Sequence, residues 1–172
     1  MRRIRYIVAM SLDGFIAGPH GEFDWIDTDP EVDFAAIWAQ FDTGLMGRLT
    51  YQVAVERLGE NAFRGMTTIV FSRTMKQEDH PQLTIIPELR TDWVQALKAR
   101  SGKDIWLFGG SQLFRAFLDV GLVDTVEVSA IPVLLGEGIP VLPPPYTPTR
   151  LKLTSHTIYR SGRVSLAYDV QR

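Results

Sequence analysis

The amino-acid sequence predicts an α/β fold with a largely parallel sheet, helices on both of its faces and an antiparallel edge. Two observations predict this class. Short apolar segments rich in β-branched residues alternate along most of the chain with segments whose apolar residues recur at helical spacing. Residues 150–170 instead alternate apolar and polar residues on both sides of the turn sequence RSGR, which is typical of an antiparallel hairpin.

The first expected strand is Ile4–Ser11, whose mostly apolar residues are typical of a buried central strand. The glycine-rich stretch DGFIAGPHGEFDW that follows indicates a loop or a short edge strand. Pro30 then opens a helix over residues 31–41, with Asp27 or Asp29 as its cap. Further strands are expected at 43–47, 67–72, 83–86, 104–108 and 124–131, and further helices at 48–58, 91–100 and 111–122.

Length and charge limit the classes of protein to consider. The chain has 172 residues, so we expect a single domain spanning residues 1–172. A net charge of -2 gives no electrostatic reason to expect nucleic acid or an anionic membrane as a partner. The apolar stretch after the basic opening MRRIR is short and is broken by Asp13, which excludes a secretory signal or membrane span there. We therefore expect a cytoplasmic protein.

Cysteine is absent, so no disulfide, thiolate nucleophile or cysteine-based metal site is possible. The three histidines, His20, His80 and His156, are too far apart to show ligand spacing, and we expect no metal site. Chemistry in this chain must therefore come from carboxylates, hydroxyls or a bound cofactor.

Three predicted strands end in sequences suited to phosphate. MGRLTY places a glycine before Arg48, which can grip phosphate with two N–H groups, and Thr50 in the first helical turn. FSRT, residues 71–74, repeats the hydroxyl–arginine–hydroxyl pattern, and FGGS, residues 108–111, leaves backbone amides free to face an anion. Each motif is also compatible with a simple turn. Their occurrence at three strand ends favours a site for an elongated ligand with more than one phosphate.

Five stretches occur in the order and spacing of a known superfamily: VAMSLDGFIAG, LMGRLTY, VFSRT, IWLFGGSQLFRAFL and VDTVEVSAIPVLLGEGIPVLP. On these motifs the chain resembles the dihydrofolate-reductase-like superfamily, and within it the reductase domain of the bifunctional riboflavin-biosynthesis deaminase-reductase. The resemblance implies a three-layer αβα fold with a mixed, mostly parallel sheet and a C-terminal antiparallel hairpin. It also implies NADPH as cofactor, a small-molecule substrate, a homodimer and a cis peptide between Gly109 and Gly110.

The resemblance further implies roles for individual residues. The arginine and hydroxyl residues after the first two junctions would hold the pyrophosphate, the adenosine and its 2′-phosphate. The glycine pair and the residues after it would cover the pyrophosphate and the nicotinamide ribose, and two apolar residues would flank the nicotinamide. The implied cofactor-binding set is Ala9, Ile16, Gly47, Arg48, Thr50, Ser72, Arg73, Thr74, Phe108, Gly109, Gly110, Ser111 and Gln112.

Two positions depart from the pattern of the riboflavin-pathway domains, which usually have Glu before the glycine pair and Lys after SLDG. Phe108 and Phe15 stand at these positions here. Two polar groups that would face the substrate have become aromatic. This change favours a more apolar, planar substrate over a phosphorylated ribosyl-pyrimidine.

Hydride transfer to a C=N or C=O group also needs a proton, and a carboxyl group is the expected source. Asp13 at the end of the first strand and Asp33 on the following helix are the catalytic candidates, with Glu31 as an alternative to Asp33. Alternatively, Asp13 forms a turn before Gly14, and Asp33 and Glu31 are acidic residues on the solvated N-terminus of a helix. Near a pocket lined by Phe15 and Phe108, such a carboxyl group would have a raised pKa. Water is the alternative proton source.

The function expected is an NADPH-dependent reductase acting on the C=N or C=O carbon of a small, heterocyclic substrate, similar to 5-amino-6-(5-phosphoribosylamino)uracil reductase. A dihydrofolate reductase is the alternative enzyme. The alternative of another class is a non-catalytic NADP-binding protein, which would bind NADPH without turnover.

Overall fold

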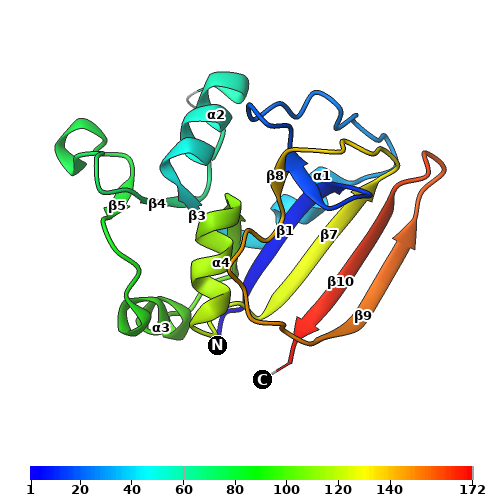
Figure 1. Cartoon of the computed structure of the whole chain (residues 1–172). Helices are drawn as coiled ribbons and strands as arrows, with labels where there is room; N and C mark the ends of the chain where they lie inside the picture. The colour runs from blue at the N-terminus through cyan, green and yellow to red at the C-terminus, as the bar shows by residue number, and fades with distance from the viewer. Residues whose placement is uncertain (60, 172) are drawn as a thin grey trace.

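The structure, a computed structural model, describes residues 1–59 and 61–171 (Figure 1). Its strands are β1 Ile4–Ser11, β2 Phe15–Ala17, β3 Phe41–Gly47, β4 Thr67–Phe71, β5 Thr84–Ile86, β6 Asp104–Gly109, β7 Thr125–Ile131, β8 Ile139–Pro140, β9 Leu151–Ile158 and β10 Val164–Val170. Its helices are α1 Phe34–Trp38, α2 Arg48–Leu58, α3 Thr91–Ala99 and α4 Ser111–Asp119, with a 3₁₀ turn η1 at Gln77–Asp79.

Eight of these strands form one sheet in the order β5-β4-β3-β6-β1-β7-β10-β9. The strands from β5 to β7 pair in parallel, whereas β10 pairs antiparallel with both β7 and β9. The prediction of a mixed, mostly parallel sheet with a C-terminal hairpin is therefore confirmed. β2 and β8 form a separate two-stranded ribbon, which the sequence indicated only as a loop or short edge strand.

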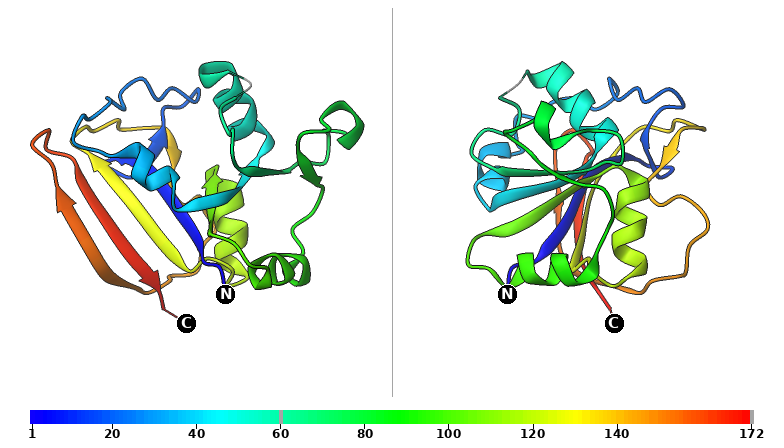
Figure 2. Two further views of the ribbon diagram at one scale, coloured as in Figure 1. Left: turned by 180° about the vertical axis from the view of Figure 1, so that it is seen from behind. Right: turned by 90° about the vertical axis from the view of Figure 1, so that its left-hand side faces the viewer.

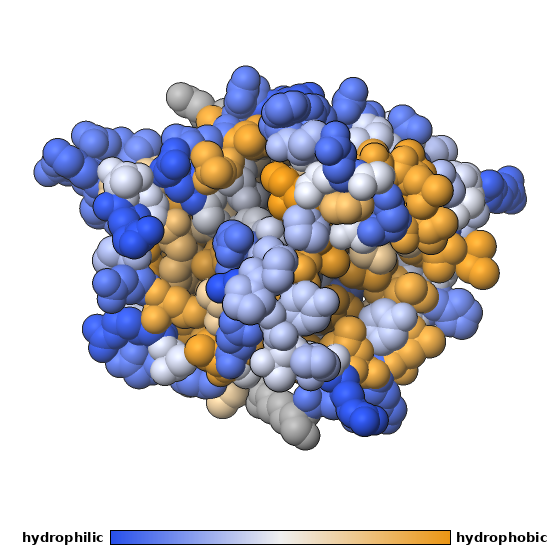
Figure 3. Space-filling model, in the orientation of Figure 1, coloured by the Kyte–Doolittle hydropathy of each residue, from blue (hydrophilic) through white to orange (hydrophobic). Residues whose placement is uncertain are grey.

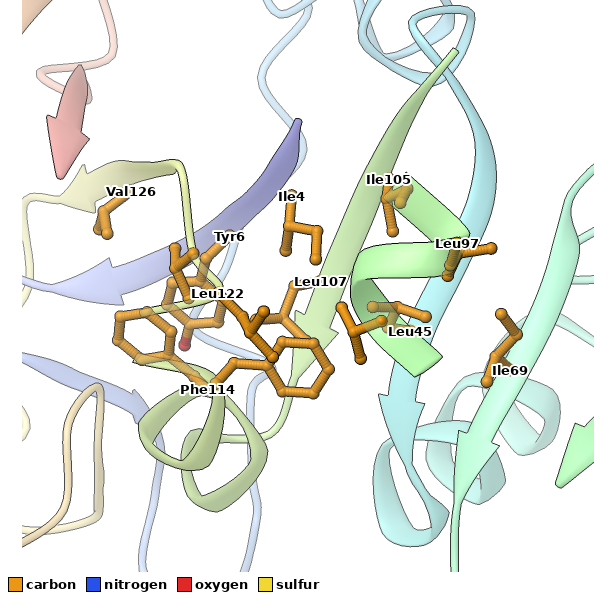
Figure 4. Close-up of a cluster of buried hydrophobic side chains, with 13 residues drawn as sticks. Ile4, Tyr6, Leu45, Ile69, Leu97, Ile105, Leu107, Phe114, Leu122 and Val126 are labelled. Atoms are coloured by element: carbon orange, nitrogen blue, oxygen red, sulfur yellow. The ribbon is translucent and has the colours of Figure 1, made fainter. Parts of the chain in front are cut away.

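Alternation along the central strands divides the side chains between two faces of the sheet. Ile4 and Tyr6 of β1 join a buried cluster with residues of α3 and α4, where the Tyr6 and Phe114 rings stack at 3.7 Å (Figure 4). On the other face, Trp106 and Phe108 of β6 contact Trp38 of α1. Figure 2 shows α1 and α4 on opposite sides of the sheet, which gives the three expected layers.

The helix predicted over residues 31–41 is shorter, because α1 covers only Phe34–Trp38. Asp33 caps it by accepting a hydrogen bond from the Ala36 amide at 2.9 Å, so neither Asp27 nor Asp29 is the cap. The buried Asp29 instead accepts from the Ser161 hydroxyl in the β9–β10 turn, which fixes this segment before the helix begins.

One edge of the sheet is exposed. Every residue of β9 is exposed, including Leu151, Leu153 and Ile158, the last at 72%. Figure 3 shows apolar side chains gathered on the side of the molecule where β9 and β10 lie. In the described part of the chain, no helix has the length and apolar character needed to span a membrane.

Candidate active site

The three phosphate-suited motifs, FSRT, MGRLTY and FGGS, lie next to one another, because they follow the neighbouring parallel strands β4, β3 and β6. Phe71 pairs with Gly47, so the chain leaves β4 and β3 side by side, at Ser72 and Arg48. Met46 pairs with Gly109, which places the ends of β3 and β6 together in the same way. The carboxyl ends of parallel strands are where ligands bind in open α/β sheets.

The amino ends of two helices meet at this edge. Gly47 is the N-cap of α2 and Gly110 the N-cap of α4, and neither helix has a side-chain cap. A Cβ added to Gly110 would lie 3.5 Å from Thr50 Oγ1 in the first turn of α2. The first-turn amides of both helices thus border one small space and carry the positive ends of the helix dipoles. This arrangement is suited to an anion.

The glycine pair has the backbone that the resemblance implied. The Gly109–Gly110 peptide is cis, and Gly109 has a φ of 93°. A Cβ on Gly109 would lie 3.4 Å from the Tyr6 ring, so the strand end packs closely on the core. A Cβ on Gly47 would have only the Gly109 carbonyl oxygen within range, at 3.8 Å. Gly47 therefore leaves open space above the junction.

The polar side chains at the end of β4 have different environments. The Ser72 hydroxyl is buried and accepts hydrogen bonds from the Thr74 and Met75 amides at 3.2 and 3.0 Å, which holds the turn. Arg73 and Thr74 are exposed beside it. Arg48, on the adjacent junction, donates to Gln52 Oε1 at 2.8 Å. We call the carboxyl ends of β4, β3, β6 and β1 the strand-end row. The two arginines, Arg73 and Arg48, follow the strands β4 and β3 at one end of this row.

At the other end of the row, β1 follows β6 in the sheet. The last registered pair is Tyr6 with Leu107, so β1 continues to Ala9 at the level where β6 turns into the glycine pair. Ile16, the other residue expected at the nicotinamide, is half-buried in β2. From β4 to β1, the predicted site residues thus follow one another in a line along the sheet edge.

The expectation of a raised pKa is wrong for Asp13. Its carboxylate accepts from the Ser11 hydroxyl at 2.6 Å and from the Leu135 and Gly136 amides, the last at 2.7 Å. These hydrogen bonds favour the ionised form and hold the pKa of Asp13 below its usual range, and the bond from Ser11 has the largest effect. Asp13 therefore joins the end of β1 to the loop after β7.

Asp33 is exposed, and its carboxylate caps α1. Its neighbours Val32 and Phe34 both line a cavity between α1 and the sheet, which is described below, but Asp33 itself is not among the lining residues. Its role as a proton donor stays a prediction. Glu31 forms an ion pair with Arg160 at 3.2 Å on the surface.

Phe108 belongs to an aromatic cluster that sequence reasoning missed. Its ring stacks on Trp106 at 4.2 Å and meets the edge of Phe63 at 5.3 Å. Gly44 on β3 makes room for it, because a Cβ there would come within 3.0 Å of the ring. The alternation of Trp106 and Phe108 on one strand is the signal that could have predicted an aromatic cluster on this face. Phe15 instead lies in β2, paired with Pro140, and no contact joins it to this cluster in the described residues.

A cavity of about 300 Å³ opens between α1 and the face of the sheet that carries Ala9. Trp106 lines it, as do Ile37 of α1 and Ser129 of β7. The resemblance implied that Ala9 flanks a nicotinamide, which stays a prediction, and sequence reasoning did not predict the cavity beside it. Among residues 1–59 and 61–171, no group of three or more His, Asp or Glu side chains is placed to hold a metal ion.

The strand order and the helices on the two faces of the sheet give the chain a dihydrofolate-reductase-like fold. More specifically, the chain belongs to the RibD C-terminal domain family, whose model matches residues 2–165. It is 35% identical over 178 residues to uncharacterized protein YyaP of Bacillus subtilis (strain 168), covering 97% of this chain and 94% of that protein.

Solved structures show the same fold. A putative riboflavin biosynthesis protein from Shewanella sp. PV-4 matches with a TM-score of 0.85 at 22% identity, over 99% of each chain. A deaminase/5-amino-6-(5-phosphoribosylamino)uracil reductase from Thermotoga maritima matches with a TM-score of 0.73 at 18% identity. This chain covers 57% of that longer protein, so the likeness concerns one part of it.

To test the role of Asp13, its carboxylate can be removed in an Asp13→Ala variant. Because the folded pKa is depressed, the loop contact should be complete above the unfolded value of about 3.9 and be lost only as the pH falls through the lower folded value. We expect the Leu135 and Gly136 amides to exchange slowly at neutral pH in the parent and much faster in the variant. Equal exchange rates, or an activity limb near neutral pH that disappears in Asp13→Asn, would restore the general-acid assignment.

Proposed function

We propose that this protein is an NADPH-dependent reductase that acts on the C=N or C=O carbon of a small, heterocyclic substrate. The observation that carries the proposal is the line of site residues along the ends of β4, β3, β6 and β1. Two exposed or half-exposed arginines stand at one end, two uncapped helix N-termini in the middle and Ala9 beside a cavity at the other. The order of these groups along the sheet edge suits a ligand with a phosphorylated end, a pyrophosphate in the middle and a flat reactive end.

The residues present fit the cofactor. Arg73 and Thr74 would hold the adenosine 2′-phosphate, with Ser72 shaping the turn and Arg48 on the neighbouring junction. Gly47 leaves room beside the uncapped start of α2, and Gly110, which lies against Thr50, has no side chain to cover the start of α4, as close approach of a pyrophosphate requires. Thr50, Ser111 and Gln112 border this space in the first turns of α2 and α4, with Gly109 and Phe108 behind it.

When bound, NADPH would supply a hydride from C4 of its nicotinamide. Ala9 and Ile16 would position that ring at the mouth of the cavity, and the aromatic face of Trp106 would limit water on the substrate side. Because Asp13 accepts hydrogen bonds from loop amides, we propose that water delivers the proton to the substrate. Asp33, which caps α1 between two cavity-lining residues, is the carboxyl group that we propose as a relay.

The family supports a reductase, since the structurally similar protein from Thermotoga maritima is a deaminase/5-amino-6-(5-phosphoribosylamino)uracil reductase. The homodimer implied by the resemblance is also proposed, with the exposed apolar edge at β9 as its contact surface. Sedimentation of the purified protein would measure this directly.

The proposal is tested in two stages with the purified chain. We expect NADPH to quench tryptophan fluorescence on binding, because Trp106 lies in the cavity beside Ala9. We then expect the absorbance of NADPH to fall only when a heterocyclic imine or carbonyl compound is added. Binding without oxidation across such a panel would favour the non-catalytic NADP-binding protein. Folded protein that fails to bind NADPH would refute the proposal.

A further inference from the structure

We propose that the substrate is uncharged and that a row of hydroxyl groups across the sheet binds its hydrogen-bonding side chain. This inference rests on the proposed reductase function, because it begins at Ala9, where the nicotinamide is placed. It goes further by assigning the space beyond the reacting ring, over β7, β10 and β9.

Strand register creates the row. Ala9 pairs with Ser129 of β7, Ser129 with Ser165 of β10, and Ser165 with Thr157 of β9. Directly paired residues project from the same face of a sheet, so the three hydroxyl groups follow Ala9 in one line. The Ser129 and Ser165 oxygens are 3.2 Å apart, which shows that the side chains turn toward each other. All four residues line the cavity.

The opposite wall of the cavity is apolar. It consists of the segment before α1 and the helix itself, which contribute Ile26, Val32, Phe34 and Ile37. Figure 2 shows α1 on the opposite side of the sheet from α4, and hydrogen bonds from Ser161 and Arg163 tie the segment before α1 to the end of the β9–β10 hairpin. The indole N–H of Trp106 is directed to the Ile7 carbonyl at 3.3 Å, so its ring presents carbon to the space. A flat ring therefore fits between apolar walls, with its polar edge toward the hydroxyl row.

The charged side chains that line the cavity are already engaged. Arg5 grips Glu127 with two hydrogen bonds of 2.6 and 2.8 Å. Arg163 is buried, donates to the Asp27 carbonyl at 2.7 Å, and its charge helps to lower the pKa of the nearby Asp29 carboxyl, after the hydrogen bonds from Ser161 and from the Glu31 amide. His156 also borders the cavity on the exposed edge strand β9, where strand alternation directs its side chain to the opposite face from Thr157. Both arginines that line the cavity therefore already have a carboxylate beside them.

This charge pattern decides the class of ligand. A phosphate or carboxylate moved into the cavity would lose its hydration and would have to compete with Glu127 and Asp29 for the two arginines, which is unfavourable. Serine and threonine hydroxyls both donate and accept hydrogen bonds, so they suit hydroxyl, carbonyl or amino groups. The substrate is therefore an uncharged heterocycle with such groups on its side chain. Its C=N or C=O carbon would accept the hydride that bound NADPH supplies, and water would supply the proton to the nitrogen or oxygen.

The inference is tested with ligand pairs that share a ring and differ in charge. We would compare 7,8-dihydrobiopterin with dihydrofolate, and uridine with uridine 5′-monophosphate, by calorimetric titration of the enzyme saturated with NADP⁺. We expect the uncharged member of a pair to bind at least about tenfold more tightly. Equal or tighter binding of the anionic members, or no binding of either neutral probe, would overturn the inference. NADPH titration is run separately, and its failure alone would refute the reductase function.

Variants locate the contact. We expect the Ser129→Ala/Ser165→Ala double variant to weaken 7,8-dihydrobiopterin about tenfold while leaving NADPH affinity and 6-methyl-7,8-dihydropterin, which lacks side-chain hydroxyls, unchanged. Thr154→Ala is the matched control, because its hydroxyl donates to the Ala167 carbonyl and does not line the cavity. Equal losses for both pterins would contradict the row as a side-chain subsite. A Ser165→Leu variant would also contradict the subsite if it kept its affinity for 7,8-dihydrobiopterin. If that variant in addition dissociated the proposed dimer, the hydroxyl row would belong to the contact between subunits.

Discussion

Replacing both Arg48 and Arg73 by alanine is expected to weaken NADPH binding about a hundredfold while changing NADH binding little. The two guanidinium groups stand where β3 and β4 end side by side. The two nucleotides differ only in the 2′-phosphate, and a hydrogen bond to a charged group contributes about 1.5–3 kcal/mol. Each arginine should therefore account for about tenfold or more. Dissociation constants for both nucleotides, measured by fluorescence titration, check this result.

Arg90→Ala is the matched control for this prediction. Arg90 is also an exposed arginine, but it pairs with Asp92 at the start of α3 instead of facing the strand-end row. Its removal should leave both dissociation constants unchanged. If the double variant weakens NADPH and NADH equally, the arginines do not read the 2′-phosphate. If it weakens neither, the adenosine end of the cofactor lies elsewhere.

Local signals in the sequence predicted most of the elements and the three junctions, but not the bounds and cap of α1 or the β2–β8 ribbon. Each junction is a contiguous motif at the end of an apolar run, so Gly47, Arg48 and the glycine pair could be assigned without knowledge of the sheet order. The resemblance to a known superfamily implied a mostly parallel sheet, but the order β4-β3-β6-β1, which brings the separate motifs into one line, was not predicted and comes from the structure. The family match and the shared fold confirm that resemblance.

Long-range contacts explain what the sequence did not predict. Asp13 was expected to have a raised pKa, but the amides that lower it come from Leu135 and Gly136, far along the chain. The start of α1 depends in the same way on the contact between Asp29 and Ser161. The hydroxyl row requires the register of four strands, of which the last two form the terminal hairpin. Such contacts leave no pattern within a single segment.

Gly47→Ala is expected to weaken NADPH binding more than tenfold while leaving the stability of the protein nearly unchanged. Its φ of -78° and ψ of 160° are open to any residue, and a Cβ would meet only the Gly109 oxygen, at 3.8 Å. The fold therefore does not require glycine here, and the change in stability should stay within about 0.5 kcal/mol. The added carbon would instead occupy space that a pyrophosphate needs beside the helix amides. Thermal unfolding and NADPH titration together measure both effects.

Gly44→Ala provides the opposite case on the same strand. Gly44 faces the aromatic cluster, where a Cβ would come within 3.0 Å of the Phe108 ring. Overpacking of this kind typically costs about 1–3 kcal/mol, so the unfolding temperature should fall while the folded protein keeps its affinity for NADPH. The pair separates the two uses of glycine in β3, because one residue makes room for a ligand and the other for a side chain. A Gly47→Ala protein that is destabilised yet binds NADPH normally would show that this glycine serves the turn, and the cofactor cradle would then have to lie away from the end of β3.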